Sequence, residues 1–315
     1  PVYNEEAGIP ALVARLQAVM EKISDQCEVI FVNDGSRDRS GALLDAVHAE
    51  DTRFKVVHLS RNFGHQVAIT AGLEFAAGDT VTMIDADLQD PPEVALEFLA
   101  KWREGYEVVY GVRSDREGET FFKLFTAQIF YRFFRSINSF EMPVDAGDFR
   151  LLDRKVVDAL LSLPERSRYL RGLVSWVGFR QIGLPYRREK RFSGHTNYTL
   201  AKMIRLAIDG VTSFSLMPLR IATTLGIAVS SLSFLAILYA GYLRFFTDRT
   251  VQGWTSLILV TLFLGGVQLF ALGIIGEYVG RVLEEARGRP LYFVGRLTGM
   301  KAKENDVPAK ARRAA

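Results

Sequence analysis

Apolar and polar residues alternate in short blocks through the first part of the chain. "EEAGIPALVARLQAVMEKI" places apolar residues at helical spacing, and "CEVIFVND" is a compact strand pattern. The same succession predicts helices over 39–49 and across "GHQVAITAGLEFA", and strands at "FKVVHLS", "TVTMIDAD" and "YEVVYGV". Pro91 and Pro92 are expected to begin a further helix. Strands that alternate with helices indicate right-handed crossovers, so we expect an α/β domain with a mostly parallel sheet.

Two later segments are uniformly apolar. Residues 221–243 and residues 254–276 are each a run of 23 residues without a charge. A helix of that length can cross the roughly 30 Å hydrocarbon layer of a bilayer. The core helix of a soluble domain seldom needs so long an uncharged stretch. The pattern therefore predicts a transmembrane hairpin over residues 219–277, in an integral protein of the inner or plasma membrane.

Flanking cations predict the orientation of this hairpin. The loop over 244–253 carries two arginines, whereas more cations lie outside the hairpin: Lys202, Arg205, Arg220, Arg281, Arg287, Arg289 and Arg296. Positive residues favour the cytoplasmic side. We therefore expect the N-terminal domain, residues 1–198, and the C-terminal segment, residues 278–315, to be cytoplasmic. The polar end of that segment is expected to be disordered.

Two stretches before the hairpin are candidates for the membrane interface. Residues 199–218 are predicted to form a juxtamembrane amphipathic helix, with apolar residues on one face: Leu200, Met203, Ile204, Ala207, Ile208 and Val211. "FFKLFTAQIFYRFFR" mixes aromatic residues with cations, as interfacial helices do. The aromatic residues of this second stretch are equally compatible with a domain core.

Composition narrows the class of protein. The formal net charge of +3 is too small to indicate nucleic-acid binding, and the basic residues are interleaved with acidic ones. A single cysteine, Cys27, excludes an internal disulfide framework and suits a reducing compartment. The chain contains neither G-x-x-x-x-G-K-[ST] nor G-x-G-x-x-G, which argues against a P-loop or a dinucleotide fold.

The stretch "MIDADLQDPPE" crowds carboxylates behind an apolar run. Like charges about 4 Å apart repel by roughly 4 kcal/mol at an effective dielectric near 20. Asp85, Asp87 and Gln89 alternate, so in an extended segment they would face the same side. Their oxygens suit a hard ion, Mg²⁺ or Mn²⁺. The alternative is a solvated turn. Asp90 is expected to cap the helix that the prolines begin, rather than to bind the ion.

Other polar residues follow neighbouring strands. Residues 33–36, "NDGS", and residues 60–62, "SRN", end two strands, as the aspartates end a third. In parallel sheets, ligands bind at this carboxyl edge, so the three groups are expected to face one crevice. For Asp34 the alternative is an ordinary turn residue, since "NDGS" is a strong turn signal.

A basic loop precedes the hairpin. "RREKRFSGHTNYT" combines four cations, Arg187, Arg188, Lys190 and Arg191, with Ser193, Gly194 and Tyr198. Such a loop can close on an anion through charge-assisted hydrogen bonds. A solvated loop without a ligand is the alternative.

Several motifs in a fixed order resemble a known family. "PVYNEE", "VNDGSRDRS" and "DADLQDPPE", followed by "VDAGDFRLLDR", "RFSGHTNYT" and the two apolar segments, resemble the family 2 glycosyltransferases of the GT-A fold. Within that family the chain is similar to polyprenyl-phosphate glycosyltransferases of the dolichyl-phosphate mannose synthase-like group. The resemblance covers nearly the whole chain.

The resemblance implies a set of donor residues. The nucleotide-sugar pocket would hold Pro1, Tyr3, Glu5, Asp34 and Asp85. Divalent-metal ligands would be Asp85, Asp87 and Gln89, and the catalytic residues Asp87 and Asp148. The family assigns Asp148 as a base, but a phosphate monoester has a second pKa near 6 and needs little deprotonation. Asp148 as a positioning residue is therefore the alternative.

The resemblance also implies an acceptor site. The residues that would bind the lipid phosphate are Lys123, Arg135, Arg191, Ser193 and Tyr198. The partners expected are a nucleotide-sugar donor, a polyprenyl phosphate acceptor, the lipid bilayer and no nucleic acid. A homo-oligomer is expected from the small residues along "GVQLFALGIIG", which permit helices of two protomers to pack.

The expected activity is metal-dependent, inverting transfer of one sugar to undecaprenyl or dolichyl phosphate at the cytoplasmic membrane face. A uridine donor such as UDP-glucose is favoured, and the product would serve cell-envelope or O-antigen glycosylation. One rival is a processive polysaccharide synthase, although "RYLRGLVSW" lacks the glutamine of Q-x-x-R-W. The other rival is a non-catalytic membrane scaffold.

Overall fold

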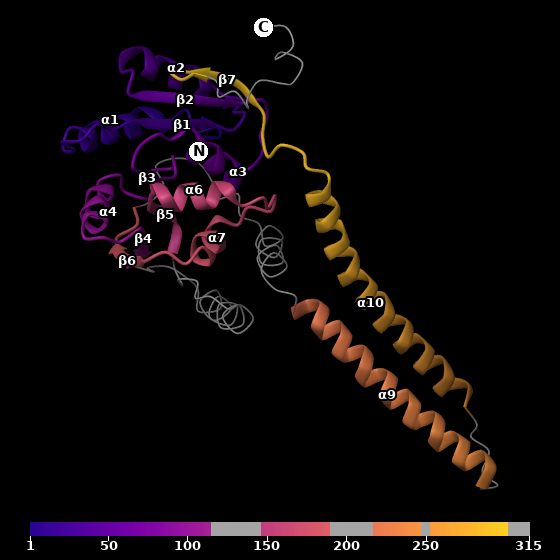
Figure 1. Ribbon diagram of the computed structural model, residues 1–315. Helices are drawn as coiled ribbons and strands as arrows, with labels where there is room; N and C mark the ends of the chain where they lie inside the picture. The colour runs from indigo at the N-terminus through magenta and orange to yellow at the C-terminus, as the bar shows by residue number, and fades with distance from the viewer. Residues whose placement is uncertain (115–145, 190–216, 247–252, 302–315) are drawn as a thin grey trace. The chain divides into compact units, whose positions relative to one another are not determined.

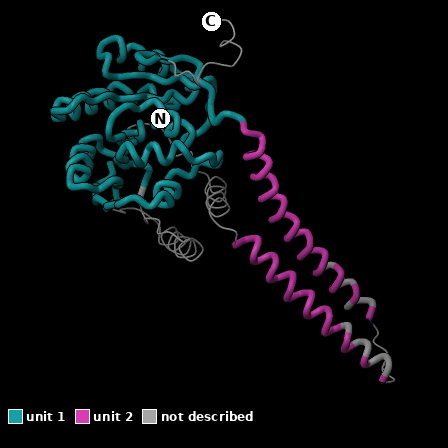
Figure 2. Tube along the Cα trace, in the orientation of Figure 1, with its two compact units in different colours: residues 1–203, 289–315 teal, residues 204–288 magenta. Residues whose placement is uncertain are grey.

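The structure is a computed structural model that describes residues 1–114, 146–189, 217–246 and 253–301. The chain divides into two compact units, which Figure 2 shows in teal and magenta. Unit 1 comprises residues 1–203 and 289–315, and unit 2 comprises residues 204–288. The sheets lie in unit 1, and two long helices form the described part of unit 2 (Figure 1).

Helices and strands alternate from the N-terminus to residue 113, as the periodicity predicts. The elements are α1 (Ile9–Met20), β1 (Val29–Asn33), α2 (Ser40–Glu50), β2 (Phe54–Leu59), α3 (His65–Phe75), β3 (Thr80–Met83), α4 (Val94–Arg103) and β4 (Val108–Arg113). Helix α4 begins after the two prolines rather than at them, because residues 91–93 form a turn in which the Val94 N–H donates to the Pro91 carbonyl.

The remaining described elements of unit 1 come from two separate parts of the chain. They are β5 (Ala146–Asp153), α6 (Arg154–Ser162), α7 (Leu170–Trp176), β6 (Gln181–Tyr186) and, after the long helices, β7 (Val294–Thr298). The Asp153 side chain caps α6 by accepting the Lys155 N–H.

The strands form two mixed sheets rather than one largely parallel sheet. Their orders are β1-β2-β7 and β3-β5-β4-β6. The pairs β1–β2 and β4–β6 are parallel, whereas β2–β7, β3–β5 and β4–β5 are antiparallel. The expectation of a mostly parallel sheet rested on consecutive strand–helix–strand crossovers. It fails because β5 lies between β3 and β4, and because β7 joins β2 from the far end of the chain.

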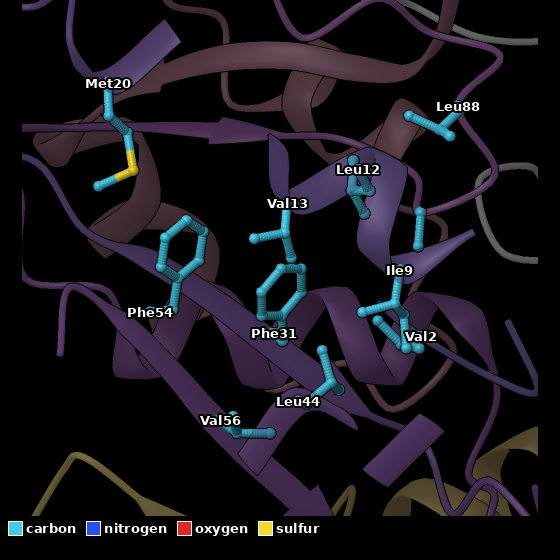
Figure 3. Packing of buried hydrophobic residues seen from close by; sticks show 11 residues of the cluster. Val2, Ile9, Leu12, Val13, Met20, Phe31, Leu44, Phe54, Val56 and Leu88 are labelled. Atoms are coloured by element: carbon cyan, nitrogen blue, oxygen red, sulfur yellow. The ribbon is translucent and has the colours of Figure 1, made fainter. Parts of the chain in front are cut away.

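The core beneath the first sheet also holds the loop after β3. Figure 3 shows α1, β1, α2 and β2 packing their apolar side chains together. The rings of Phe31 and Phe54 stack with centroids 6.0 Å apart. Ala86 and Leu88, from the loop with the three aspartates, belong to the same cluster. The acidic loop is therefore fixed to the core by its own apolar residues.

Unit 2 contains two long apolar helices, α9 (Met217–Phe246) and α10 (Trp254–Ala286), which pack against each other. By length and composition, Met217–Ala236 and Phe263–Ala286 are candidate membrane spans. Large apolar side chains such as Leu232 and Phe270 are exposed. Both helices extend beyond the uncharged segments, and α10 continues past the predicted hairpin boundary at residue 277.

The chain returns to unit 1 after α10, which the division at residue 278 does not anticipate. Strand β7 pairs with β2, and Arg296 and Thr298 both donate to the Asp45 carboxylate of α2. Part of the predicted C-terminal segment is therefore a component of the N-terminal fold. The predicted juxtamembrane helix, 199–218, lies almost entirely outside the described residues.

Candidate functional site

The loop after β3 that carries Asp85, Asp87 and Asp90 is called the acidic loop. Partly exposed and buried residues alternate along it, but its backbone is not extended as predicted. The strand ends at Met83, and a turn at residues 86–87 replaces the expected extended segment. Leu88 has a φ of 59°, rare for a bulky residue, and is held there by its burial in the core. Ala86, Leu88 and Asp90 are buried, whereas Asp85, Asp87 and Gln89 are partly exposed.

The partly exposed members of this loop are suitable ligands for a hard divalent ion. The Asp87 carboxylate accepts the N–H of Gln89 at 3.1 Å, which shapes the turn. Burial raises the pKa of Asp85, and the imidazole of His65 lies 3.5 Å away. Among the described residues, no group of three or more His, Cys, Asp and Glu side chains is arranged to hold a metal. If Asp85 and Asp87 each supplied one ligand, an amide, waters and a substrate phosphate could fill the remaining coordination positions, as is common at Mg²⁺ and Mn²⁺ sites.

Asp90 does not cap α4, so that part of the sequence prediction is wrong. Glu93 occupies the N-cap position and makes no side-chain cap bond. The Asp90 side chain is instead buried, where it accepts a hydrogen bond from the Tyr186 hydroxyl. The Nε of Arg188 lies 3.6 Å from the same carboxylate.

Asp148 lies on β5 among strong donors. Arg171 donates from Nε to Oδ1 at 2.8 Å and from Nη2 to Oδ2 at 3.2 Å, and Gln66 donates to Oδ2 at 3.1 Å. The Nε2 of His65 lies 3.3 Å from the same oxygen. Burial alone would raise the pKa of Asp148, but the charge of Arg171 and the bonds from His65 and Arg171 lower it far below its usual range.

His65 connects the two acidic groups. Its Nε2 is 3.5 Å from Asp85 and 3.3 Å from Asp148. Burial lowers the pKa of His65, but the hydrogen bond with Asp148 and the charge of Asp85 outweigh that and raise it overall. The imidazole therefore bridges the acidic loop and β5, in surroundings that favour its protonated form.

Three residues of this cluster, His65, Gln66 and Arg171, are not among those predicted from the sequence. The first two begin α3, immediately after the carboxyl edge of β2, and this position was the available signal. Arg171 lies on α7 and had no comparable signal. Gln66 also accepts the Leu170 N–H at 3.1 Å, which fixes α7 against α3.

Asp34 is buried and braces the neighbouring loop. Its carboxylate accepts the N–H of Phe63 at 2.7 Å and the N–H of Gly64 at 3.0 Å. Burial raises the pKa of Asp34, while these two bonds act in the opposite direction. The turn that it stabilises delivers His65 to its position. The place of Asp34 in a nucleotide-sugar pocket stays a prediction.

The N-terminal motif lies beside Asp34. Val2 forms a parallel bridge with Asn33, and the Asp34 N–H donates to the Val2 carbonyl at 2.9 Å. The Glu5 N–H donates to the Ser40 hydroxyl at 3.0 Å, and the ring of Tyr3 is exposed. The structure therefore brings the predicted donor residues Pro1, Tyr3, Glu5 and Asp34 to the end of β1.

The predicted acceptor residues lie outside the described part of the chain. They are Lys123, Arg135, Arg191, Ser193 and Tyr198. Arg187 and Arg188, the first two cations of the basic loop, are described and follow β6.

Comparison with known proteins identifies the family. The family model described as glycosyl transferase family 2 matches residues 1–161, which include β1 to β5. The chain belongs to glycosyl transferase family 2. A second model, the GtrB C-terminal hairpin, matches residues 217–282, which include α9 and most of α10. The resemblance noted from the motifs is confirmed, and the family 2 membership makes the chain a glycosyltransferase of the α/β GT-A class.

Two relatives match this family 2 chain over most of their lengths. It is 50% identical over 303 residues to the uncharacterized glycosyltransferase YkcC of Bacillus subtilis, covering 96% of this chain and 94% of the relative. It is 39% identical over 297 residues to the bactoprenol glucosyl transferase of Shigella phage SfII, covering 93% and 95%. Among solved structures, mannosyl-3-phosphoglycerate synthase from Rubrobacter xylanophilus aligns at 16% identity and a TM-score of 0.46, covering 82% and 77%.

Proposed function

We propose that the protein is a polyprenyl-phosphate glycosyltransferase. It would transfer one sugar, with inversion, from a nucleotide sugar to undecaprenyl or dolichyl phosphate. The observation that carries this proposal is the joining of a family 2 domain to a hairpin of candidate membrane spans. The bactoprenol glucosyl transferase of phage SfII matches 93% of the chain, including both parts. UDP-glucose is the favoured donor, and the lipid-linked sugar would serve cell-envelope or O-antigen glycosylation.

The donor would be held at the acidic loop. Asp85 and Asp87 both offer partly exposed hard oxygens, and Asp85 has a raised pKa that a cation would relieve. We assign these two residues and Gln89 as ligands for Mg²⁺ or Mn²⁺. Such an ion, when bound, neutralises charge on the departing nucleoside diphosphate. The exposed Tyr3 ring and the neighbouring Glu5 would border the nucleotide.

Asp148 is better suited to positioning than to proton abstraction. Its pKa is held far below the usual range, so it is a weak base at neutral pH. A lipid phosphate is already mostly ionised under the same conditions, because its second pKa is near 6. We therefore assign Asp148, with Arg171 and His65, to orienting the sugar while the phosphate oxygen attacks the anomeric carbon in line.

The acceptor would meet the donor at a membrane surface. The candidate spans expose large apolar side chains, which suits lipid contact. The positive-inside bias favours a catalytic unit on the cytoplasmic face. Lys123, Arg135, Arg191, Ser193 and Tyr198 stay the proposed contacts of the lipid phosphate.

The test is a substrate panel on the full chain in detergent or nanodiscs. UDP- and GDP-sugars are supplied with undecaprenyl phosphate and Mg²⁺ or Mn²⁺, with and without chelator. The expected result is one lipid-linked sugar for each nucleoside diphosphate released, and loss of both with chelator. Products longer than one sugar would favour the processive synthase. Absence of nucleotide release with every donor would favour the scaffold.

A single substitution tests the metal assignment. Asp87→Asn is expected to lower turnover by about 100-fold or more, because a neutral amide supports a divalent ion poorly. The control Asp79→Asn removes an exposed carboxylate just before β3 and is expected to leave turnover unchanged. Near-normal turnover by Asp87→Asn would remove Asp87 from the metal site.

A further inference from the structure

Three separate contacts join the acidic loop to the end of β6. The Gln89 carbonyl accepts the Glu189 N–H at 2.9 Å. The guanidinium of Arg15 binds both Glu93, at 2.6 Å, and Glu189, at 2.9 Å. The third contact is the hydrogen bond from the Tyr186 hydroxyl to Asp90. The acidic loop and its continuation are thus held against residues 186–189 along their length.

The Tyr186–Asp90 pair is the buried member of this set. Asp90 is 2% exposed and Tyr186 is 5% exposed. A phenol that donates to an ionised carboxylate makes a strong, directional bond. Burial and the charge of Asp90 raise the pKa of Tyr186, so the hydroxyl keeps its proton. An apolar pair of similar size would stabilise a core at least as well, which suggests that the polar pair serves geometry.

Tyr186 also contacts the strand that carries Asp148. Its ring meets Phe149, the residue after Asp148 on β5, edge to face at 5.4 Å between centroids. A side chain at Gly111 of β4 would come within 2.6 Å of the same ring, so the close packing requires glycine there. The Tyr186 carbonyl accepts from the Ser114 N–H at 3.0 Å. One side chain therefore connects the acidic loop with β4 and β5.

We propose that Tyr186 and Asp90 are positioning residues for sugar transfer. Their hydrogen bond fixes the loop of Asp85 and Asp87 in register with Asp148 on β5, and so aligns the donor with the attacking group. Neither residue touches the reacting atoms. The inference rests on the proposed function for the roles of Asp85, Asp87 and Asp148.

Tyr186→Phe tests the bond directly, because it removes the hydroxyl and keeps the ring packed on Phe149. The kcat for sugar transfer is expected to fall by about 10-fold to 100-fold, as small misplacements of reacting groups do. The KM for the nucleotide sugar is expected to change by less than about threefold, because the donor-binding residues remain. Asp90→Asn keeps an oxygen acceptor and is expected to lose less kcat than Asp90→Ala.

A matched control comes from the same unit. The Tyr292 hydroxyl donates to Glu74 at 2.5 Å, which is the same chemistry away from the acidic loop. Tyr292→Phe is expected to lower the thermal midpoint without changing kcat. The double variant Asp90→Ala/Tyr186→Phe is expected to lose no more kcat than Asp90→Ala alone, because one interaction is removed twice.

Two outcomes would overturn the positioning role. One is a Tyr186→Phe enzyme that loses thermal stability like Tyr292→Phe but keeps wild-type kcat. The other is a double variant whose losses add as for independent sites. Wild-type turnover in the same assay tests the proposed function separately. If the wild type transfers sugar to another acceptor, the kcat ratio of variant to wild type with that acceptor still decides the role of Tyr186.

Discussion

Two clusters in unit 1 are built from the same three residue types. They are Asp148, His65 and Arg171, the β5 cluster, and Asp45, His58 and Arg296, the β7 cluster. In both, an imidazole and a guanidinium contact one carboxylate. The β5 cluster joins β5 to α3 and α7, whereas the β7 cluster joins β2 and α2 to the strand that follows the candidate membrane spans.

The two histidines nevertheless have opposite electrostatic environments. His65 lies between two carboxylates, Asp148 and Asp85, and its pKa is raised despite burial. His58 faces one carboxylate and lies beside Arg296, and burial, with that positive charge, lowers its pKa. Residue types alone therefore do not distinguish a functional cluster from one that only holds the fold together. The two clusters differ in the number of carboxylates near the imidazole, and the additional carboxylate near His65, that of Asp85, belongs to the acidic loop.

The largest expected difference is in the loss of turnover when the aspartate of each cluster is replaced by asparagine. Asp148→Asn should reduce sugar transfer by about 100-fold or more, because a neutral amide cannot balance the charge of Arg171 or accept from Arg171 and His65 as a carboxylate does. Asp45→Asn should leave turnover intact and lower the thermal midpoint by roughly 3–6 °C, as expected for losing about 1–2 kcal/mol of hydrogen bonding. Turnover and thermal unfolding of both variants in detergent test this. Equal loss of turnover in both would abolish the distinction.

The next largest difference is expected in the free energy of unfolding that is lost when each arginine is replaced by glutamine. Arg171→Gln leaves the buried Asp148 short of a cation and should cost about 2–3 kcal/mol, allowing for the partial exposure of Arg171. Arg296 is more exposed, so Arg296→Gln should cost about 0.5 kcal/mol. Urea unfolding followed by tryptophan fluorescence measures both. A larger cost at Arg296 would mean that β7, rather than β5, carries the more strongly coupled ion pair.

The pH dependence of stability in acid is a second test of the ion pair between Arg171 and Asp148. A depressed carboxylate pKa contributes stability above the unfolded value, near 3.9, and loses it as the pH falls through the folded value. For Asp148 that loss begins below about pH 5, where the unfolded chain starts to bind the proton, and continues into strong acid, because the folded pKa is far below the usual range. Arg171→Gln raises this pKa towards or above the unfolded value, so the variant should lose less stability than the wild type as the pH falls below about 5. Thermal midpoints between about pH 3 and pH 6 show whether it does.

The histidines should show opposite pH dependence, with a smaller effect. His65 has a raised pKa, so its stabilisation is present below the ordinary value of 6.5 and is lost as the pH rises through the folded pKa. His58 has a lowered pKa, so its stabilisation is present above 6.5 and is lost as the pH falls through the folded pKa. His65→Gln should therefore cost more near pH 6 than near pH 9, and His58→Gln more near pH 8 than near pH 5.

Each histidine effect should be about 1 kcal/mol or less, or roughly 2–4 °C, since His65 is partly exposed and solvent screens its ion pairs. Thermal midpoints of both variants across that pH range are the measurement. Parallel curves for the two variants would show that the histidines share one charge state, which would contradict the comparison.

Much of the fold follows from local patterns in the sequence. Helices and strands up to residue 113 were predictable because the spacing of apolar residues is a local property. The uncharged runs likewise predicted α9 and α10. Asp85, Asp87 and Gln89 are partly exposed, but a turn around the buried Leu88 produces this exposure, rather than the extended segment that the alternation predicted.

The polar partners were not predictable, because they come from distant parts of the chain. Asp148 meets His65 across 83 positions, Asp90 meets Tyr186 across 96, and Arg296 meets Asp45 across 251. Such pairs depend on which strands become neighbours, and the antiparallel insertion of β5 was not evident from crossover rules. Asp90 illustrates the consequence, since local reasoning assigned it to a helix cap while a distant tyrosine is its partner.

The last prediction concerns which ring nitrogens of His58 and His65 carry protons. It tests the comparison between the two clusters most directly. The Asn33 Oδ1 accepts the Ser36 N–H at 3.0 Å, so its Nδ2 faces the Nδ1 of His58, 3.0 Å away. Taking Nδ1 as the acceptor of that amide places the proton on Nε2, which then donates to Asp45 at 3.1 Å, in competition with the Arg296 Nη2 that lies 3.2 Å from the same nitrogen. Nitrogen chemical shifts of ¹⁵N-histidine-labelled protein should show a neutral, Nε2-protonated His58 near pH 7, and a pH titration should show His65 gaining its second proton at a higher pH than His58.

Protonating His58 would set two donors, its Nδ1–H and the Asn33 amide, against each other. Asn33→Asp replaces the amide donor with a carboxylate, so it should raise the pKa of His58 and move its resonance towards that of His65. Asp45→Asn should lower the pKa of His58 further, because it removes the one carboxylate that the ring contacts. A His58 that is already doubly protonated near pH 7 in the wild type would remove the difference between the clusters. The presence of Asp85 would then no longer account for the charge on His65.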